Sequence, residues 1–234
     1  MTTRQAIADL WRQSAQTTRT DIFGAADSLR PVYAVQSALD QQIDVAAVGM
    51  VGQRYAAGGV VLLSVNPAGG SAHSTTNAAS DEMYEAFRGM RSASSGVEAT
   101  AFLDRVERAV TASMPYWRIT TQYVAAILDA LGKGVQDIAY LYLVPFRTAA
   151  DAGSKMPPAY CKAGYRLHLE PQLDLLQPAL IVCVDRPSEA AARKWAAESV
   201  SSTRCEVFYF TRKRDAHAER RALLDELRAS YSEC

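Results

Sequence analysis

Hydrophobic residues are distributed along this chain in two patterns, one typical of buried strands and one typical of surface helices. Short stretches that are almost entirely apolar predict strands of a parallel sheet that is covered on both faces. These stretches are residues 60–65, 138–146, 179–185 and 206–211. Elsewhere apolar residues recur every three or four positions, which predicts helices. The expected helices are residues 5–16, 28–47, 81–90, 99–112, 119–131, 159–176, 188–198 and 215–230.

The order of these elements predicts the fold class. Strands that alternate with helices indicate an α/β protein, a three-layer α/β/α sandwich around a central four-stranded parallel sheet. With 234 residues, the chain is long enough for one domain with its own core. We therefore expect a single domain over residues 1–234, with residues 1–50 as N-terminal helices packed on it.

In such a sheet, ligands bind beyond the carboxyl ends of the strands. The segments that follow the strands are therefore the candidate site: Asn66-Pro67-Ala68, Pro145-Phe146-Arg147, Asp185-Arg186-Pro187 and Thr211-Arg212-Lys213. Residues 69–95 mix Gly, Ser, Thr, Asn and Ala around one short helix, so we expect a long loop region beside the binding face.

Composition narrows the class of protein without identifying its activity. The 49% hydrophobic and 21% charged residues are ordinary for a globular domain, which excludes a disordered, collagen-like or coiled-coil chain. Lys and Arg together number 25, as do Asp and Glu, so any surface that binds nucleic acid must be a local patch. One such patch is predicted in residues 204–221, where six basic residues outnumber three acidic ones.

The spacing of cysteines and histidines predicts no metal site. The four cysteines, at positions 161, 183, 205 and 234, are too far apart in sequence for a zinc knuckle or a compact iron–sulfur site. We interpret His168 as structural, whereas His73 and His217 lie near the first and last strand exits and could reach the site. Neither of these two has a carboxylate at an obvious spacing. Because no stretch reaches the ~18 apolar residues of a membrane span and the first residues lack a signal-peptide pattern, we expect a soluble, cytoplasmic protein.

Three segments resemble the uracil-DNA glycosylase superfamily. VLLSVNPAGG, residues 61–70, is similar to its first motif, in which a buried strand runs into G-x-N-P-G or G-E-x-P-G. LHLEPQLDLLQPALIVCVD, residues 167–185, is similar to the helix-then-strand segment of the iron–sulfur, family-four type. MPYWRITTQYVAAILDALG, residues 114–132, resembles the helix behind the aromatic side chain that stacks on the flipped base. The resemblance covers about residue 50 to the C-terminus and implies a uracil-DNA glycosylase-like fold.

The chain departs from the family-four pattern at several positions. It has no N-terminal cysteine pair, and Phe146 and Tyr165 stand where the other two cluster cysteines are expected. We therefore expect no iron–sulfur cluster and no other cofactor. Tyr142 stands where the family usually has an Asn that reads the uracil edge, and Thr211 to Arg214 replace its His-Pro-Ser loop. These departures imply a pocket rebuilt for something other than plain uracil.

The resemblance assigns roles to the residues at the strand ends. Hydrolysis of the bond between base and sugar needs a flipped nucleotide, a placed water, and stabilisation of a cationic sugar and a departing base anion. The catalytic candidates are Asn66, whose amide carbonyl would orient the water, and Arg212, whose charge would assist the leaving base. The base-binding candidates are Tyr116, Tyr142, Pro67 and Ala68. The DNA-binding candidates are Gly69, Gly70, Arg147, Lys213 and Arg214.

Plainer interpretations of the same residues remain open. Asn66-Pro67 can be only a turn that ends a strand. Tyr142 can be a core residue, which would leave uracil release to backbone contacts. Residues 212–214 can be the solvated start of a helix.

Three functions follow from these interpretations. The first is a DNA glycosylase that acts on a modified pyrimidine, such as the bulky bases of some bacteriophage DNA, with a role in phage defence. The second is a nucleic-acid-binding protein that has kept the fold and lost the chemistry. The third is a small-molecule hydrolase or nucleotide-binding enzyme on a similar sheet. Under the first, the partner is DNA through a flipped nucleotide, with no membrane, and the protein acts as a monomer.

Overall fold

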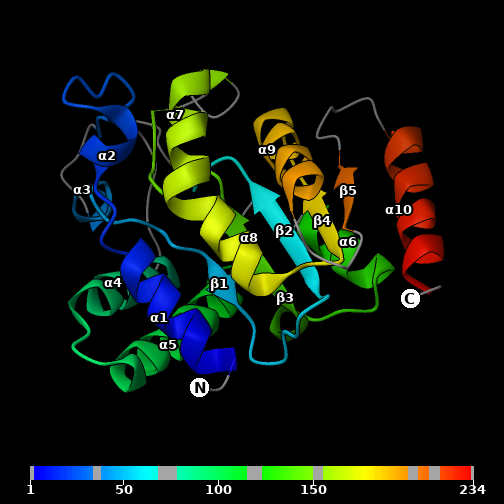
Figure 1. Ribbon diagram of the computed structural model, residues 1–234, viewed down its shortest axis with the longest axis horizontal. Coiled ribbons are helices and arrows are strands. Elements are labelled where there is room, and N and C mark those ends of the chain that lie inside the picture. The colour runs from blue at the N-terminus through cyan, green and yellow to red at the C-terminus, as the bar shows by residue number, and fades with distance from the viewer. Residues whose placement is uncertain are drawn as a thin grey trace.

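A five-stranded mixed sheet forms the centre of the protein (Figure 1). The computed structural model describes residues 3–33, 38–67, 78–114, 123–149, 155–199, 205–210 and 217–232. Its strands are β1 (Met50–Val51), β2 (Val60–Ser64), β3 (Ile138–Tyr142), β4 (Leu180–Cys183) and β5 (Glu206–Tyr209), in the spatial order β1-β3-β2-β4-β5. Neighbouring strands from β3 across to β5 are parallel, whereas β1 pairs with β3 in the antiparallel direction. The predicted α/β class is confirmed.

The prediction of a four-stranded, all-parallel sheet is wrong at one edge, where β1 adds a fifth strand. This strand has only two residues, so it is too short to show any periodicity in the sequence. Two glycines flank it, and they allow the chain to come very close to β3. A Cβ atom on Gly52 would lie 2.2 Å from the carbonyl oxygen of Gln136, and one on Gly49 would lie 2.7 Å from that of Tyr140.

The helices lie in the connections between the strands. Before β1 come α1 (Thr3–Ser14), α2 (Arg19–Phe23) and α3 (Ala38–Gln42). Between β2 and β3 come α4 (Ala78–Ser92), α5 (Gly96–Ser113), α6 (Ala125–Ala130) and the short 3₁₀ turn Val135–Asp137. Between β3 and β4 come α7 (Pro158–Gly164), the π-helical turn η5 (Tyr165–Leu169) and α8 (Glu170–Leu176). The last helices are α9 (Arg186–Glu198), between β4 and β5, and α10 (His217–Ser232).

The sheet topology places these helices in layers. The chain moves from β2 to β3 in one direction across the sheet and from β4 to β5 in the other. Since parallel crossovers are right-handed, we expect the connection from β2 to β3 on one face and α9 on the opposite one. Helices α4 and α5 lie near the β1 edge of the sheet (Figure 1). Figure 1 shows α8 and α9 side by side in front of the sheet.

Most predicted helices are present with shifted ends, but the helix expected over residues 28–47 is wrong. Within that range the described residues are helical only in α3. Asp27 accepts a hydrogen bond from the backbone N–H of Leu29 at 3.1 Å, and Arg30 pairs with Asp44 at 2.7 Å. Val32, which the helical pattern placed on a buried face, is 79% exposed. The side chain of Asp27 thus bonds to the backbone just where the helix was expected to begin, which favours a turn over a helix.

The core extends through the three central strands. Every residue of β2, β3 and β4 is buried, as predicted for strands covered on both faces, whereas β5 lies at an edge and is partly exposed. One hydrophobic cluster includes residues from Ile7 in α1 to Leu227 in α10. Among the described residues, no helix combines the length and the apolar character needed to cross a membrane.

His168 lies in the core, which makes stability depend on pH. Its side chain is fully buried in η5, and neither ring nitrogen has a hydrogen-bond partner among the described residues. Burial lowers the pKa of His168 from 6.5 to about 3. Below pH 6.5 the unfolded chain binds a proton at this residue that the folded chain excludes, so stability falls as the pH falls toward 3.

Because of His168, we expect the free energy of unfolding to decrease by about 1.4 kcal/mol for each unit that the pH falls between pH 6 and 4. Replacing His168→Phe should flatten that part of the profile, because phenylalanine has no group to protonate. Urea unfolding at several pH values, followed by circular dichroism, measures the slope. An identical slope for the variant would show that His168 does not contribute to acid sensitivity.

Candidate functional site

The ends of β2, β3 and β4 meet at one edge of the sheet. The chain leaves β2 toward β3 on one side, while β4 lies on the other side of β2, so the strand order reverses at β2. In open α/β sheets, ligands bind at such a point, beyond the carboxyl ends of the strands. Backbone pairing continues past the regular strands. The backbone N–H of Val144 donates to the carbonyl oxygen of Val65 at 2.7 Å, and that of Val184 donates to the carbonyl oxygen of Leu63 at 3.1 Å. The three exits therefore have fixed relative positions.

Asn66 lies at the centre of this edge. Its side-chain nitrogen Nδ2 donates to Oγ1 of Thr148 at 2.8 Å and to the carbonyl oxygen of Pro67 at 3.3 Å. Thr148 belongs to the segment after β3, so this bond joins the ends of two strands. Because the amide nitrogen bonds to protein atoms, the carbonyl Oδ1 is the group of Asn66 that can face a ligand or a water. Asn66 is half-buried, whereas Pro67 is buried.

Asp185 joins the third strand end to the same site. One oxygen of its buried carboxylate, Oδ2, accepts the backbone N–H of Val65 at 2.8 Å. The other, Oδ1, accepts the backbone N–H of Ser188 at 2.9 Å and its hydroxyl at 2.5 Å. Asp185 is thereby the N-cap of α9 and also the anchor of the residue just before Asn66.

Replacing Asp185→Ala is expected to lower the free energy of unfolding by about 3 kcal/mol, because buried N–H groups of Val65 and Ser188 lose their acceptor. Asp185→Asn should lower it less, since the amide retains one acceptor oxygen. Asp225→Ala is the matched control, because that carboxylate is 63% exposed. Urea unfolding of the four proteins gives the differences. Equal stabilities for Asp185→Ala and Asp225→Ala would contradict the anchoring role.

Arg147 lies beneath the site rather than on the surface. Its side chain is only 7% exposed, and its guanidinium carbon lies 4.9 Å from the centre of the Tyr84 ring. The carbonyl oxygen of Arg147 accepts a hydrogen bond from Nη1 of Arg19 at 2.7 Å, which attaches α2 to the segment after β3. In this arrangement Arg147 supports the strand exits from within. Its predicted contact with DNA stays a prediction.

Tyr142 is packed in the core at the end of β3. It is 5% exposed, and its ring meets the ring of Tyr140 edge-on at 5.3 Å between centres. Burial raises the pKa of Tyr142 well above its usual value, so the phenol stays protonated. The packing agrees with the plainer interpretation of Tyr142 as a core residue, and its contact with a base stays a prediction.

The other candidates lie outside the described residues. They are Ala68, Gly69, Gly70, Tyr116, Arg212, Lys213 and Arg214. Their predicted roles therefore stay predictions from the sequence.

The two residues at the expected cluster positions do not supply metal ligands. Phe146 is fully buried and meets Phe23 edge-on, with 6.2 Å between ring centres. The ring of Tyr165 lies 4.0 Å from Nζ of Lys194. Within the part of the chain that the structure describes, no three His, Cys, Asp or Glu side chains are close enough together to hold a metal ion. The side chains at these positions do not fit an iron–sulfur cluster.

Thr148 belongs to the site, but the sequence did not identify it, and the sequence assigned no role to Asp185. The sequence placed Asp185 at a strand exit, and Ser188 three residues later matches the capping contact that it makes. The bond to Val65 spans 120 residues and that from Asn66 to Thr148 spans 82, so no local spacing reveals either.

Comparison with known proteins assigns no family. No protein-family model matches the chain. No curated protein matches it either. The resemblance to the uracil-DNA glycosylase superfamily therefore stays a prediction, and the geometry of the strand exits is the main guide to function.

Proposed function

We propose that the protein is a DNA glycosylase that flips a modified pyrimidine out of DNA and hydrolyses the bond between that base and its sugar. The observation that carries the proposal is the position of Asn66. Its amide nitrogen is bonded to Thr148, and its neighbour Val65 is bonded to Asp185, so the amide carbonyl has a fixed place at the edge where such sheets bind ligands. A uracil-DNA glycosylase-like fold, implied by the resemblance of the three segments, is part of the proposal.

The chemistry uses these groups as follows. Oδ1 of Asn66 accepts a hydrogen bond from a water and directs the water oxygen at C1′ of the flipped nucleotide. A bond forms between that oxygen and C1′, while the bond from C1′ to the base breaks and its electron pair leaves with the base. The proton released by the water passes to the base anion or to solvent. Because an amide is a weak base, catalysis depends on orientation and on electrostatic stabilisation.

Two charged residues have proposed roles in that transition state. The carboxylate of Asp185, bonded to the residue before Asn66, favours positive charge developing on the sugar. The cation at Arg212 is predicted to favour negative charge on the departing base. If the enzyme prefers a modified base that occurs in phage DNA, a role in defence against phage would follow.

An excision assay over a panel of duplexes tests the proposal. The duplexes carry uracil, hydroxymethylcytosine or glucosylated cytosine at one position, and alkaline cleavage reports the abasic site. We expect release from at least one modified-base duplex. Binding to DNA without release from any duplex would favour the silent nucleic-acid-binding protein, and absence of both would favour a small-molecule enzyme. Binding is measured by fluorescence titration with single-stranded and abasic DNA at two salt concentrations.

A further inference from the structure

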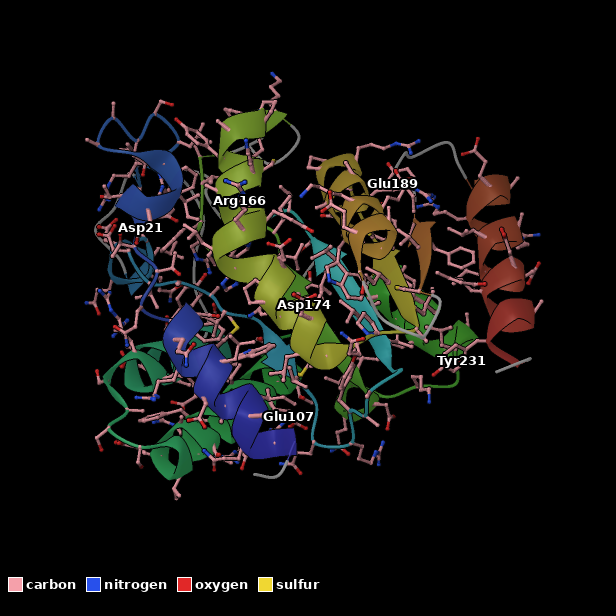
Figure 2. The ribbon with its side chains drawn as sticks, in the orientation of Figure 1. Asp21, Glu107, Arg166, Asp174, Glu189 and Tyr231 are labelled. Carbon is pink, nitrogen blue, oxygen red and sulfur yellow. The ribbon has the colours of Figure 1, made fainter. Side chains whose placement is uncertain are left out.

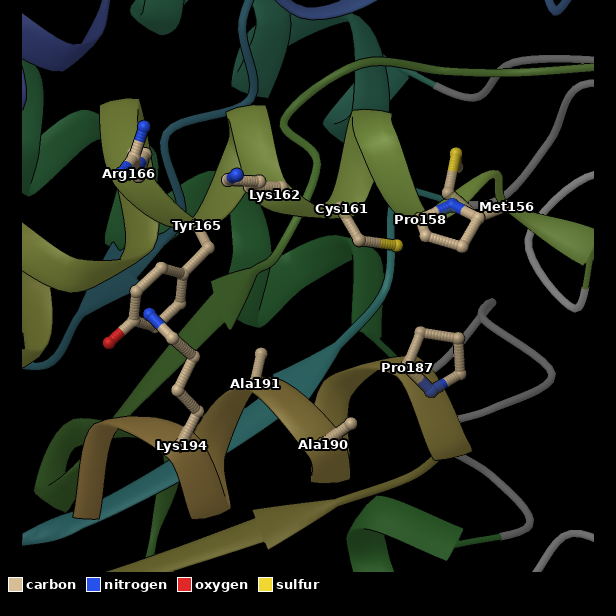
Figure 3. A pocket seen from close by; sticks show the side chains of 10 residues that line it. All are labelled: Met156, Pro158, Cys161, Lys162, Tyr165, Arg166, Pro187, Ala190, Ala191 and Lys194. Atoms are coloured by element: carbon tan, nitrogen blue, oxygen red, sulfur yellow. The ribbon is translucent and has the colours of Figure 1, made fainter. Parts of the chain in front are cut away.

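A groove lies between two helical segments on the front of the sheet, α7 with η5 on one side and α9 on the other (Figure 3). Its volume is about 580 Å³, within the range of small-molecule sites. Figure 2 places Arg166 and Glu189 on these two segments. Residues 158–166 and 187–194 contribute nearly all of its lining.

The two ends of the groove differ in chemistry. Met156, Pro158 and Pro187 form an apolar end, and Ala190 gives a low wall beside them (Figure 3). Toward the opposite end lie the cationic side chains of Lys162, Arg166 and Lys194. None of the ten described residues that line the groove is acidic.

The acidic residues of α9 face cations rather than the groove interior. Glu189 accepts from Arg186 at 2.6 Å and from Arg193 at 3.0 Å. Glu198 pairs with Lys194 at 3.0 Å, but both side chains are about half exposed, so water screens that pair. Nζ of Lys194 also lies 4.0 Å from the centre of the Tyr165 ring. Burial and the nearby carboxylates of Glu170, Glu198 and Asp174 raise the pKa of Tyr165, so this end also has acidic neighbours. Its positive character rests on Lys162 and Arg166 together with Lys194, and it favours an anion.

Two contacts fix the width of the groove. Nε1 of Trp195 in α9 donates to Oδ1 of Asp174 in α8 at 2.7 Å, which ties the two helices together. On the other wall, Gly164 packs against the segment after β3, where an added Cβ would lie 2.2 Å from the carbonyl oxygen of Leu143. Both walls are thus attached to the rigid centre of the protein, and the groove is formed before any ligand arrives.

We propose that this groove binds a small amphipathic anion from solution, a molecule with a hydrocarbon or aromatic body and one carboxylate, sulfonate or phosphate head. The body lies between Pro158 and Pro187, and the head lies near Lys194. A nucleobase suits the apolar end less well, because its edge carries several polar atoms and these walls offer few hydrogen-bond partners. The groove adjoins the proposed glycosylase site, because Pro187 follows the strand exit at Asp185 and Asp185 lies near Cys161. The proposal does not depend on that function.

Fluorescence titration with anilinonaphthalene sulfonate tests the proposal, with the neutral compound N-phenylnaphthylamine as the matched probe. We expect one anion per protein, bound more tightly than the neutral probe. Replacing Ala190→Trp, an exposed position on the groove wall, should fill the space and abolish binding of both probes. Ala101→Trp, at an exposed position on α5 outside the lining, should leave binding unchanged.

A substitution that removes one positive charge distinguishes the contribution of the ligand's anionic head from that of its apolar body. Lys194→Gln should weaken binding of the anionic probe about fivefold, the size expected for one partly exposed ion pair, with little effect on the neutral probe. Arg91→Gln, at an exposed position on α4, is its control. Equal binding of the two probes, or no effect of Ala190→Trp, would overturn the proposal. Capture of the protein on phosphatidylglycerol vesicles without binding of the soluble anion would also overturn it.

Cys161 provides a second measurement, because it lines the groove. Burial and the nearby carboxylate of Asp185 raise the pKa of Cys161 to about 11, so alkylation is best followed near pH 9, where some thiolate is present. We expect the anion to slow alkylation of Cys161 and not that of Cys205, which lies outside the lining. Equal rates with and without the anion would contradict occupation of the groove.

Discussion

A duplex that carries uracil is expected to lose its base at least ~10⁴-fold more slowly than a duplex that carries the preferred modified pyrimidine. An amide side chain can offer uracil both a donor and an acceptor, and a phenol with one hydroxyl cannot reproduce that pair. At the position where the resemblance expects the amide, this protein has Tyr142, whose ring is packed against Tyr140. The polar edge of uracil would therefore enter the pocket without its matched partners.

Single-turnover excision from matched duplexes measures this ratio directly. Tyr142→Phe is the informative variant, because it keeps the packed ring and removes only the hydroxyl. If Tyr142 acts only through the packing of its ring, Tyr142→Phe should leave the ratio nearly unchanged. If its hydroxyl contacts the base, Tyr142→Phe should change the ratio. Efficient release of uracil with no preference for a modified base would refute the rebuilt pocket.

Replacing Asn66→Ala is expected to slow base release about 100- to 1,000-fold, the cost of removing one preorganised polar group from a transition state. DNA affinity should stay nearly unchanged, since the role proposed for the amide is to orient the water and not to hold the DNA backbone. Thr148→Val is expected to cause a smaller loss of rate, because the amide remains but loses its hydrogen bond at 2.8 Å. Gln136→Ala, at an exposed position outside the site, is the neutral control.

Rates and affinities of these variants come from single-turnover excision and from fluorescence titration with the same duplex. An unchanged rate for Asn66→Ala would mean that Asn66 and Pro67 only end a strand. A parallel loss of rate and affinity would assign Asn66 to binding and not to the chemical step.

The sequence was informative wherever structure follows from neighbouring residues. Continuous apolar runs predicted β2, β3 and β4 because a strand buried on both faces has no polar alternation. The apolar spacing of residues 28–47 wrongly predicted a helix. Val32 is exposed there, and the bonds made by Asp27 and Arg30 favour a non-helical backbone.

The site was predictable only in part, for the same reason. Asn66 follows a strand and could be found from its motif. The partners that fix its position, Thr148 and Asp185, approach from chain segments far away in sequence. Their contribution depends on tertiary structure, which a single sequence without aligned relatives does not reveal. The strand β1 was missed because pairing with β3, and not its own two residues, defines it.

The double contact of Asp185 couples the strand exits to α9. One rigid carboxylate joins the first turn of this helix, through Ser188, to the backbone of Val65, so a displacement of either end is transmitted to the other. The same helix forms a wall of the groove. An anion that prefers one position of α9 would therefore change the affinity of the strand exits for DNA, and DNA would change the affinity for the anion by the same factor. Because this coupling would be reciprocal, the groove would act as an effector site for DNA binding.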